Sequence, residues 1–256
     1  MTRAFAAPVH PLASLYGPPP WRFAGRSLTV IAECAPDAVA ALVPAPLRPV
    51  GAQVRFSVHA LQCDLGFGWA WAQANPHRSQ FHEAVVGIAV EHEGRVGHWD
   101  PFLWTDGDAE LAVGREMYGW PQRLGTMALT TPHPLHGFRN GDRVAGRVAR
   151  LTEAVFTCNV TLQREGELDV PQPPFVGFYT ERALPDPAAR RLVRELFFST
   201  MQEVRIADLR SGPAELALHA EELRALGPLR VLGGKAHAVA WVKDSSELVR
   251  RSEEPY

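Results

Sequence analysis

Short segments of alternating apolar and polar residues recur along the chain. Val54–Val58 and Thr157–Leu162 alternate residue by residue, which is typical of strands with one face on a core and the other face exposed. Other short runs are rich in Val, Phe, Trp and Thr and end at Gly, Pro or Asp, so they are also predicted as strands. The predicted strands are Leu28–Ile31, Gln53–Leu61, Gly68–Gln73, Ala84–Glu91, Val144–Leu151, Phe156–Arg164 and Ala236–Val242.

Helical patterns are fewer. The three best are Pro36–Leu42, Asp108–Tyr118 and Pro187–Phe197. The first has a proline and an aspartate in its first turn, and the last opens at Asp186 with a capping residue followed by a proline near the first helical position. The pattern therefore predicts a mostly antiparallel β architecture with a few short helices.

Length and composition favour a single packed domain. The 256 residues contain no linker-like stretch, so we predict one domain over residues 1–256. With 46% hydrophobic and 21% charged residues, the chain can bury a substantial core. Because 28 acidic residues nearly balance 26 basic ones, the sequence favours neither nucleic-acid binding nor a polybasic membrane patch. The expected partner is a small molecule or another copy of the chain.

Targeting and redox signals are weak. Met1 to Pro20 lacks the apolar run of a signal peptide, and no stretch of about 18 apolar residues could span a bilayer. We therefore expect a cytoplasmic protein. The three cysteines Cys34, Cys63 and Cys158 are an odd number at wide spacing, which indicates reduced thiols.

Motifs for common cofactors and metals are missing. The chain has no Gly-rich phosphate loop, no G-x-S-x-G, no H-E-x-x-H and no C-x-x-C. One cluster of histidines and glutamates looks metal-like, but neighbours on a strand point to opposite faces, so few of them could converge on one ion. We therefore expect neither a metal nor a cofactor. The cluster comprises His82, Glu83, Glu91, His92, Glu93 and His98.

The most informative stretch is Glu110–Gly125, which reads ELAVGREMYGWPQRLG. It resembles the signature of the acetoacetate decarboxylase superfamily, in which A-x-G-R-E is followed by a proline, two lysines and L-G. Further segments agree with that family in order, so the resemblance spans nearly the whole chain. These segments are Gly17–Trp21, Val43–Leu47, Val54–Phe56, Gly212–Leu216 and a late strand through His237.

The resemblance carries expectations about fold and assembly. It implies a closed, mostly antiparallel β-barrel with extra strands and a few short helices, and a partly apolar internal cavity near Gln122. Members of the family assemble into closed rings, so the resemblance also implies a homo-oligomer of at least two copies.

The family's reaction depends on a lysine that this chain lacks. In the family, the first lysine of the signature pair forms a Schiff base with a carbonyl substrate, and the second lysine lowers its pKa. By position, these residues are Gln122 and Arg123 here. An amide cannot form an imine, so the usual mechanism cannot start at Gln122. Arg123 keeps the positive charge and offers a planar fork for a carboxylate.

Other positions of the family site can be matched one by one. The family's acidic residue after the Trp-rich hairpin corresponds to Glu83, and its substrate-side arginine corresponds to Arg26, to within one residue of alignment. A second family glutamate is replaced by Ser57. Tyr118 and Trp120 are candidate residues of the cavity wall, as are Trp71, Phe81 and Trp104, whereas Arg115 and Glu116 are expected to be architectural.

We interpret the chain as a lyase-like enzyme that acts on a keto or enol carboxylate without a Schiff base. Arg123 and Arg26 would hold the carboxylate, Gln122 would donate to a carbonyl oxygen and Glu83 would serve as acid and base. Dehydration, cyclisation or tautomerisation in secondary metabolism would fit these groups.

Two alternatives stay open. The chain has only two lysines, Lys235 and Lys243. A decarboxylase or aldolase-dehydratase could use Lys235 as a relocated amine. A non-catalytic module that binds a carboxylate is the other alternative.

Overall fold

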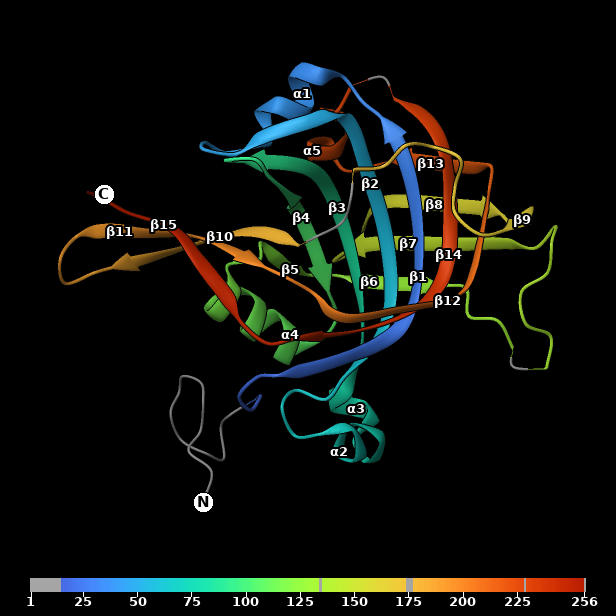
Figure 1. Cartoon of the computed structure of the whole chain (residues 1–256), viewed down its shortest axis with the longest axis horizontal. Coiled ribbons are helices and arrows are strands. Elements are labelled where there is room, and N and C mark those ends of the chain that lie inside the picture. Colours follow the sequence, from blue (N-terminus) through green and yellow to red (C-terminus); the bar gives the residue numbers. More distant parts are fainter. Residues whose placement is uncertain (1–14, 134, 174–176, 228, 256) are drawn as a thin grey trace.

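The structure is a computed structural model that describes residues 15–133, 135–173, 177–227 and 229–255. It is mainly β, with a few short helices (Figure 1). Its strands are β1 (Trp21–Glu33), β2 (Arg48–Cys63), β3 (Gln80–His92), β4 (Arg95–Thr105), β5 (Gln122–Leu124), β6 (Thr126–Leu129), β7 (Arg143–Arg150), β8 (Glu153–Thr161), β9 (Arg164–Glu165), β10 (Phe178–Asp186), β11 (Arg191–Ser199), β12 (Gln202–Gly212), β13 (Ala214–Leu218), β14 (Arg230–Lys243) and β15 (Ser246–Pro255). Its helices are α1 (Pro36–Ala41), α2 (Trp69–Ala74), α3 (Pro76–Ser79), α4 (Asp108–Val113), the π-helical turn Gly114–Tyr118 and α5 (Glu221–Arg224).

The strands form two sheets. The larger sheet has the order β15-β11-β10-β4-β3-β2-β1-β14-β12-β9, with β5 paired to β4, and the smaller has the order β13-β8-β7-β6. Neither sheet closes on itself among the described residues, so the expected closed barrel is not confirmed. The larger sheet instead curves over the smaller one, and β10, β11 and β15 project from the body as an arm (Figure 1).

The main core lies between the two sheets. Val54, Phe56 and Val58 of β2 are fully buried there, and they pack in one cluster with residues of β7 and β8 such as Val148 and Phe156. Because the side-chain period of a strand is two, the odd-numbered neighbours of these β2 residues face the other side of the large sheet. That other side carries the polar groups described below.

Most predicted elements are present with shifted ends. Pro36–Leu42 corresponds to α1, and Asp108–Tyr118 corresponds to α4 followed by the π-helical turn. The predicted strands lie in or largely overlap β1, β2, β3, β7, β8 and β14, except Gly68–Gln73, which was wrong. This segment forms most of helix α2, which packs through Trp71 against a second apolar cluster.

The predicted helix Pro187–Phe197 was also wrong. The segment forms the turn between β10 and β11 and most of β11. Asp186, interpreted as a helix cap, instead accepts a hydrogen bond from the Ala189 amide at 3.1 Å within that turn. Strand β11 pairs with β10 on one side and with β15 on the other. These non-local pairings outweigh the local helical signal.

Two properties of the described residues concern membranes and metals. None of their helices combines the length and the apolar character needed to cross a membrane. Their His, Cys, Asp and Glu side chains form no group of three or more that could hold a metal ion.

Candidate functional site

The centre of the candidate site is a contact between Gln122 and Glu83. Gln122 Nε2 donates to Glu83 Oε2 at 3.3 Å. The two residues lie on β5 and β3, on either side of β4, where Glu83 is opposite Thr105 and Gln122 is opposite Leu103. Gln122 is 5% exposed, and its Oε1 is buried without a hydrogen-bond partner among the described residues. The amide oxygen is therefore a buried acceptor, and it packs against Gly114.

The backbone around Gln122 is held by the turn that precedes it. The Gln122 carbonyl accepts from Arg115 Nη1 at 3.0 Å, in line with the architectural role expected for Arg115. The Trp120 amide donates to the Gly114 carbonyl at 2.9 Å. A Cβ atom at Gly114 would overlap Gln122 Oε1. Only glycine at position 114 therefore leaves room for the amide side chain in this position.

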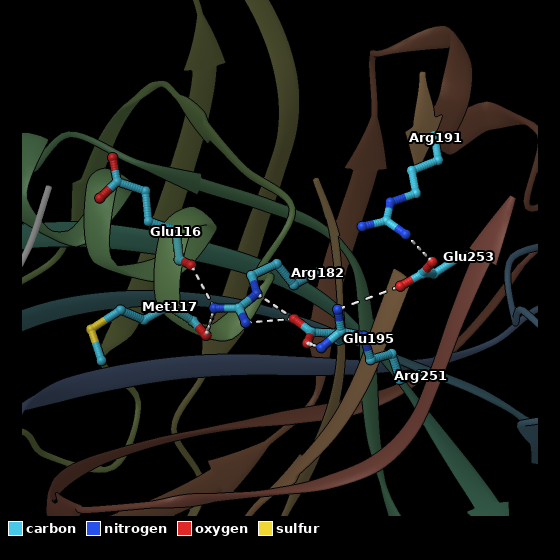
Figure 2. Close-up of polar contacts among 7 residues, drawn as sticks. All are labelled: Glu116, Met117, Arg182, Arg191, Glu195, Arg251 and Glu253. Carbon is cyan, nitrogen blue, oxygen red and sulfur yellow. Dashed lines mark hydrogen bonds and ion pairs between the residues drawn. The ribbon is translucent and has the colours of Figure 1, made fainter. Parts of the chain in front are cut away.

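The π-helical turn is anchored from outside by Arg182. Arg182 Nη1 donates to the carbonyls of Glu116 at 2.9 Å and Met117 at 3.3 Å, and Arg182 Nε donates to the Glu195 carboxylate at 3.0 Å. Figure 2 shows that this guanidinium lies between the turn and the strands of the arm. Ion pairs extend the network along the arm through Arg251, Glu253 and Arg191.

Replacing Arg182 with Met should loosen this anchor. The change removes the donors of two carbonyls and the main partner of Glu195, which is 13% exposed in its side chain. We expect a loss of about 1–3 kcal/mol in the free energy of unfolding, measured in urea. Arg251→Met is the matched control, because Arg251 is 54% exposed and should cost less than about 1 kcal/mol. Equal losses for the two variants would contradict the anchoring role.

The electrostatic setting of Glu83 favours a proton on its carboxyl group. Burial, followed by the charge of Asp100, raises its pKa from 4.5 to about 7, against the opposing effects of Gln122, Arg55 and Lys243. A carboxyl group with a pKa near 7 can both donate and accept a proton at neutral pH.

A second buried carboxyl group belongs to Glu110 of α4, which is 4% exposed. Burial raises its pKa to about 8, with a further contribution from Glu83. Its Oε1 has no hydrogen-bond partner in the part of the chain that the structure describes. At neutral pH this group is therefore largely protonated and uncharged.

A partly buried ion pair supplies a cation whose charge acts on Glu83. Arg55 Nη2 donates to Asp100 Oδ1 at 2.9 Å, and the guanidinium lies 5.6 Å from the centroid of the Phe178 ring. The pair forms beside Gly87, where a Cβ atom would overlap the Arg55 side chain. A guanidinium is planar and carries five N–H donors, a geometry that suits carboxylates.

Two neutral histidines continue the polar face across the sheet. His59 is opposite Glu83 on the neighbouring strand, and Ser27 is opposite both His59 and His237. Burial and nearby positive charge lower the pKa of His59 to about 3 and that of His237 to about 4. Both imidazoles are uncharged at neutral pH and can each donate one hydrogen bond.

Lys243, at the end of β14, is buried beside the same site. It is 8% exposed, and its Nζ lies 3.7 Å from the centroid of the Tyr118 ring and 5.3 Å from that of the Trp120 ring. Burial lowers its pKa from 10.5 to about 7, and the charge of Glu83 opposes this shift. Tyr118 and Trp120, predicted as substrate-binding residues, thus flank an amine that lies close to Glu83.

The structure does not bring Arg123 and Arg26 to this site. Arg123 is paired with Trp104 rather than with Leu103, so it lies on the face of β5 opposite to Gln122, where its 40% exposed side chain forms an ion pair with Glu222 at 3.2 Å. Adjacent residues of a strand face opposite sides, so Gln122 and Arg123 cannot share one cavity.

Arg26 and Lys235 also lie elsewhere. Arg26 is on the same face of β1 as the core residue Leu28, and it forms an ion pair with Asp208 at 3.4 Å. Lys235 forms an ion pair with Glu167 at 2.7 Å. Its position on β14 is eight residues from Lys243, or about 26 Å at a rise of about 3.3 Å per residue.

Sequence reasoning missed four residues of the site. Arg55 stood in the recognised Val54–Phe56 segment and Glu110 opened the recognised signature stretch, so both carried a signal that was not used. Asp100 carried none, and Lys243 could not be distinguished from Lys235, because the surroundings of both missed residues depend on segments distant in the chain. The missed residues are Arg55, Asp100, Glu110 and Lys243.

Comparisons with known proteins agree on one family. A family model described as acetoacetate decarboxylase (ADC) matches residues 6–252. An acetoacetate decarboxylase of Burkholderia cenocepacia is 26% identical over 239 residues, which cover 90% of this chain and 87% of that protein. An acetoacetate decarboxylase of Burkholderia vietnamiensis is 25% identical over 234 residues, with the same coverage.

Solved structures share the fold. An acetoacetate decarboxylase-like enzyme from Sphingomonas wittichii RW1 superposes with a TM-score of 0.87 at 26% identity, covering 98% of this chain and 99% of the other. The enduracididine biosynthesis enzyme MppR complexed with pyruvate gives a TM-score of 0.85 at 23% identity, with 98% of each chain covered. The second likeness shows the fold alone.

Proposed function

Because the chain belongs to the acetoacetate decarboxylase family, we propose that it is an enzyme that acts on a small keto or enol carboxylate by acid–base chemistry at Glu83. The observation that carries the proposal is the contact between the Glu83 carboxyl group, whose pKa is raised to about 7, and the buried amide of Gln122. This arrangement can move a proton next to a carbonyl group at neutral pH.

In the proposed reaction, Glu83 removes a proton from the carbon next to the carbonyl and returns it at the product stage. Gln122 Nε2 donates to the oxygen that gains negative charge in the enolate. His59 and His237 offer further neutral donors along the same face. Proton removal of this kind is the first step of dehydration, cyclisation and enol–keto tautomerisation, which are the reaction types we propose.

Arg55 takes the carboxylate of the substrate in this proposal. The sequence assigned that role to Arg123 and Arg26, but Arg55 is the arginine whose charge acts on Glu83. Asp100 accepts a hydrogen bond from the guanidinium at 2.9 Å, which fixes the position of the Arg55 charge.

The proposed substrate is a short oxo acid. The relatives from Burkholderia are acetoacetate decarboxylases by name, and acetoacetate combines a ketone with a carboxylate. A surface hollow is lined in part by Leu61 and Phe81, which lie two residues from His59 and Glu83 on the same strands.

The proposal is tested by proton exchange. In deuterated buffer, the wild-type protein should accelerate the replacement of the methyl protons of pyruvate or the C2 protons of acetoacetate by deuterium, followed by NMR. Heat-denatured protein gives the background rate. An oxo acid that binds but never exchanges or reacts would favour a carboxylate-binding module instead, and an absence of both binding and exchange across a panel of oxo acids would remove the proposal.

A further inference from the structure

Lys243 is the buried cationic residue that the acid–base proposal leaves unused. A lysine with 8% exposure normally costs stability, because its charge is removed from water. Lysine side chains of this length usually extend to the surface, yet β14 ends here with the ammonium end held among aromatic rings. A position that is costly for folding and adjacent to a reactive site calls for a chemical explanation.

The turn that carries Gln122 also holds Lys243. Nζ lies 3.7 Å from the centroid of the Tyr118 ring and 5.3 Å from that of the Trp120 ring. The backbone N–H of Gln122 donates to the Trp120 carbonyl at 2.8 Å. The two rings that contact the amine therefore belong to the same short segment as the Gln122 side chain. Strand β14, which is separated from β2 by β1 in the sheet, thus places an amine beside the segment that carries Gln122.

The charge of Lys243 acts on Glu83 directly. Each of the two groups shifts the pKa of the other toward the charged form. Trp21, which is opposite Lys243, packs in one cluster with Leu61 and Phe81 from the strands of His59 and Glu83. Burial is the larger effect on both and lowers the pKa of Lys243 to about 7. A substantial fraction of the amine is therefore uncharged and nucleophilic at neutral pH.

The other lysine has a different setting. Lys235 forms an ion pair with Glu167 at 2.7 Å and lies toward the opposite end of β14. It faces a carboxylate rather than aromatic rings. Of the two lysines in the chain, only Lys243 lies beside Gln122 and Glu83.

We propose that Lys243 is the amine that forms a Schiff base with the oxo acid, in place of the amine that position 122 lacks. The inference rests on the proposed function, since it needs a carbonyl substrate in the same site. It makes Lys243 a catalytic residue delivered from β14 rather than from the segment of the family signature.

Formation of the Schiff base releases water and needs a proton donor, which is the Glu83 carboxyl group. The lone pair of uncharged Nζ attacks the carbonyl carbon, and the C=O π electrons move to the oxygen. That oxygen leaves as water, taking one proton from Nζ and one from the Glu83 carboxyl group. The products are a protonated iminium at Lys243 and the Glu83 carboxylate.

The surrounding residues suit the product of that step. The iminium keeps one positive charge, which the faces of Tyr118 and Trp120 can stabilise as they do the ammonium. The iminium acidifies the protons on the neighbouring carbon, and the Glu83 carboxylate formed in the first step is the base that removes one of them.

Borohydride trapping tests the inference with pyruvate as the probe. Hydride adds to the iminium carbon and leaves a stable secondary amine, which is detected by intact mass and mapped by peptide sequencing. Wild-type protein should carry one adduct, at Lys243. Lys235→Met is the matched control and should be trapped like the wild type, whereas Lys243→Met should show at least a tenfold loss of adduct.

A stability measurement shows whether the Lys243 variant is folded. The folded pKa of Lys243 lies below its unfolded value, so the cost of burying its charge is fully present below pH 7 and disappears as the pH rises toward 10.5. Lys243→Met should therefore melt at a higher temperature than the wild type at pH 6, with a smaller difference at pH 10. Lys243→Gln serves as a second variant if the methionine protein is insoluble.

The outcomes separate this inference from the proposed function. Exchange without an adduct in the wild type, with exchange retained in Lys243→Met, overturns the Schiff base and leaves the acid–base role of Glu83 standing. An adduct that maps to Lys235 also overturns it. If the wild type shows neither exchange nor an adduct with pyruvate or acetoacetate, the proposed function fails together with the inference.

Discussion

Glu83→Gln should lower the rate of proton exchange by about 10²–10⁴-fold, the usual cost of losing a general acid–base group. The change removes the titrating group and nearly preserves its shape and its position opposite His59. Affinity for the oxo acid should stay the same or improve, because a carboxylate next to an anionic ligand repels it in the ground state. Calorimetry gives the affinity, and exchange followed by NMR gives the rate.

Glu222→Gln is the matched control for this variant. Glu222 lies on α5, where its 41% exposed side chain pairs with Arg123, so its exchange rate should equal that of the wild type. A Glu83→Gln protein that exchanges protons at the wild-type rate would exclude Glu83 from the mechanism. If affinity and rate both fell in this variant, the residue would be a binding group rather than the acid and base.

The second large effect concerns the affinity for the carboxylate. Arg55→Met on its own would leave the Asp100 carboxylate buried and unpaired, so the test combines Arg55→Met with Asp100→Asn. The double variant removes the Arg55 cation together with the Asp100 carboxylate, so that neither charge is left buried without its partner. We expect the oxo acid to bind more weakly by about 2–4 kcal/mol, because the ligand loses a partly desolvated charge partner. Calorimetry measures this difference.

Arg123→Met is the control, because the sequence alignment assigned carboxylate binding to Arg123 and the structure-based proposal assigns it to Arg55. Arg123 lies on the other face of β5 and pairs with Glu222, so its loss should change the affinity by less than about 0.5 kcal/mol. Asp100→Asn alone shows what the loss of the acidic partner does by itself. A large loss of affinity in Arg123→Met and none in the double variant would return the role of carboxylate binder to Arg123.

The pattern of apolar residues predicted β1, β2, β3, β7, β8 and β14, but not the remaining strands or how the sheets join. Alternation identifies β2 and β8 because each has one face in the core between the sheets. The failed helix Pro187–Phe197 shows the limit of local signals. The pairing of Arg191 with Pro255 joins residues far apart in the chain, and no local pattern encodes such a contact.

The face of the strand on which a residue lies decides whether its side chain can reach the candidate site. The family resemblance assigned Gln122 and Glu83 to the site, and the structure brings their side chains to 3.3 Å. The same reasoning also assigned Arg123 and Arg26, which lie on the opposite faces of β5 and β1. A shift of one residue places a side chain on the opposite face of the sheet. An alignment that is uncertain by one residue therefore cannot decide which strand residues face a site.

Lys243 shows a different limit. Lysine near a strand end is ordinarily exposed, and nothing local distinguishes Lys243 from Lys235. Its burial depends on Tyr118 and Trp120, which a turn more than a hundred residues earlier in the chain places against it. Only the folded chain shows which of the two lysines meets Glu83.

The central claim is that Glu83 exchanges a proton at neutral pH, and the pKa of its carboxyl group is the most direct test. Protein labelled with ¹³C at the side-chain carboxyl carbons of glutamate should give one NMR resonance that disappears in Glu83→Gln. We predict that this resonance titrates near pH 7, where burial and Asp100 place it. A midpoint near the ordinary value of 4.5 would show that Glu83 is a plain carboxylate at neutral pH and would contradict the account.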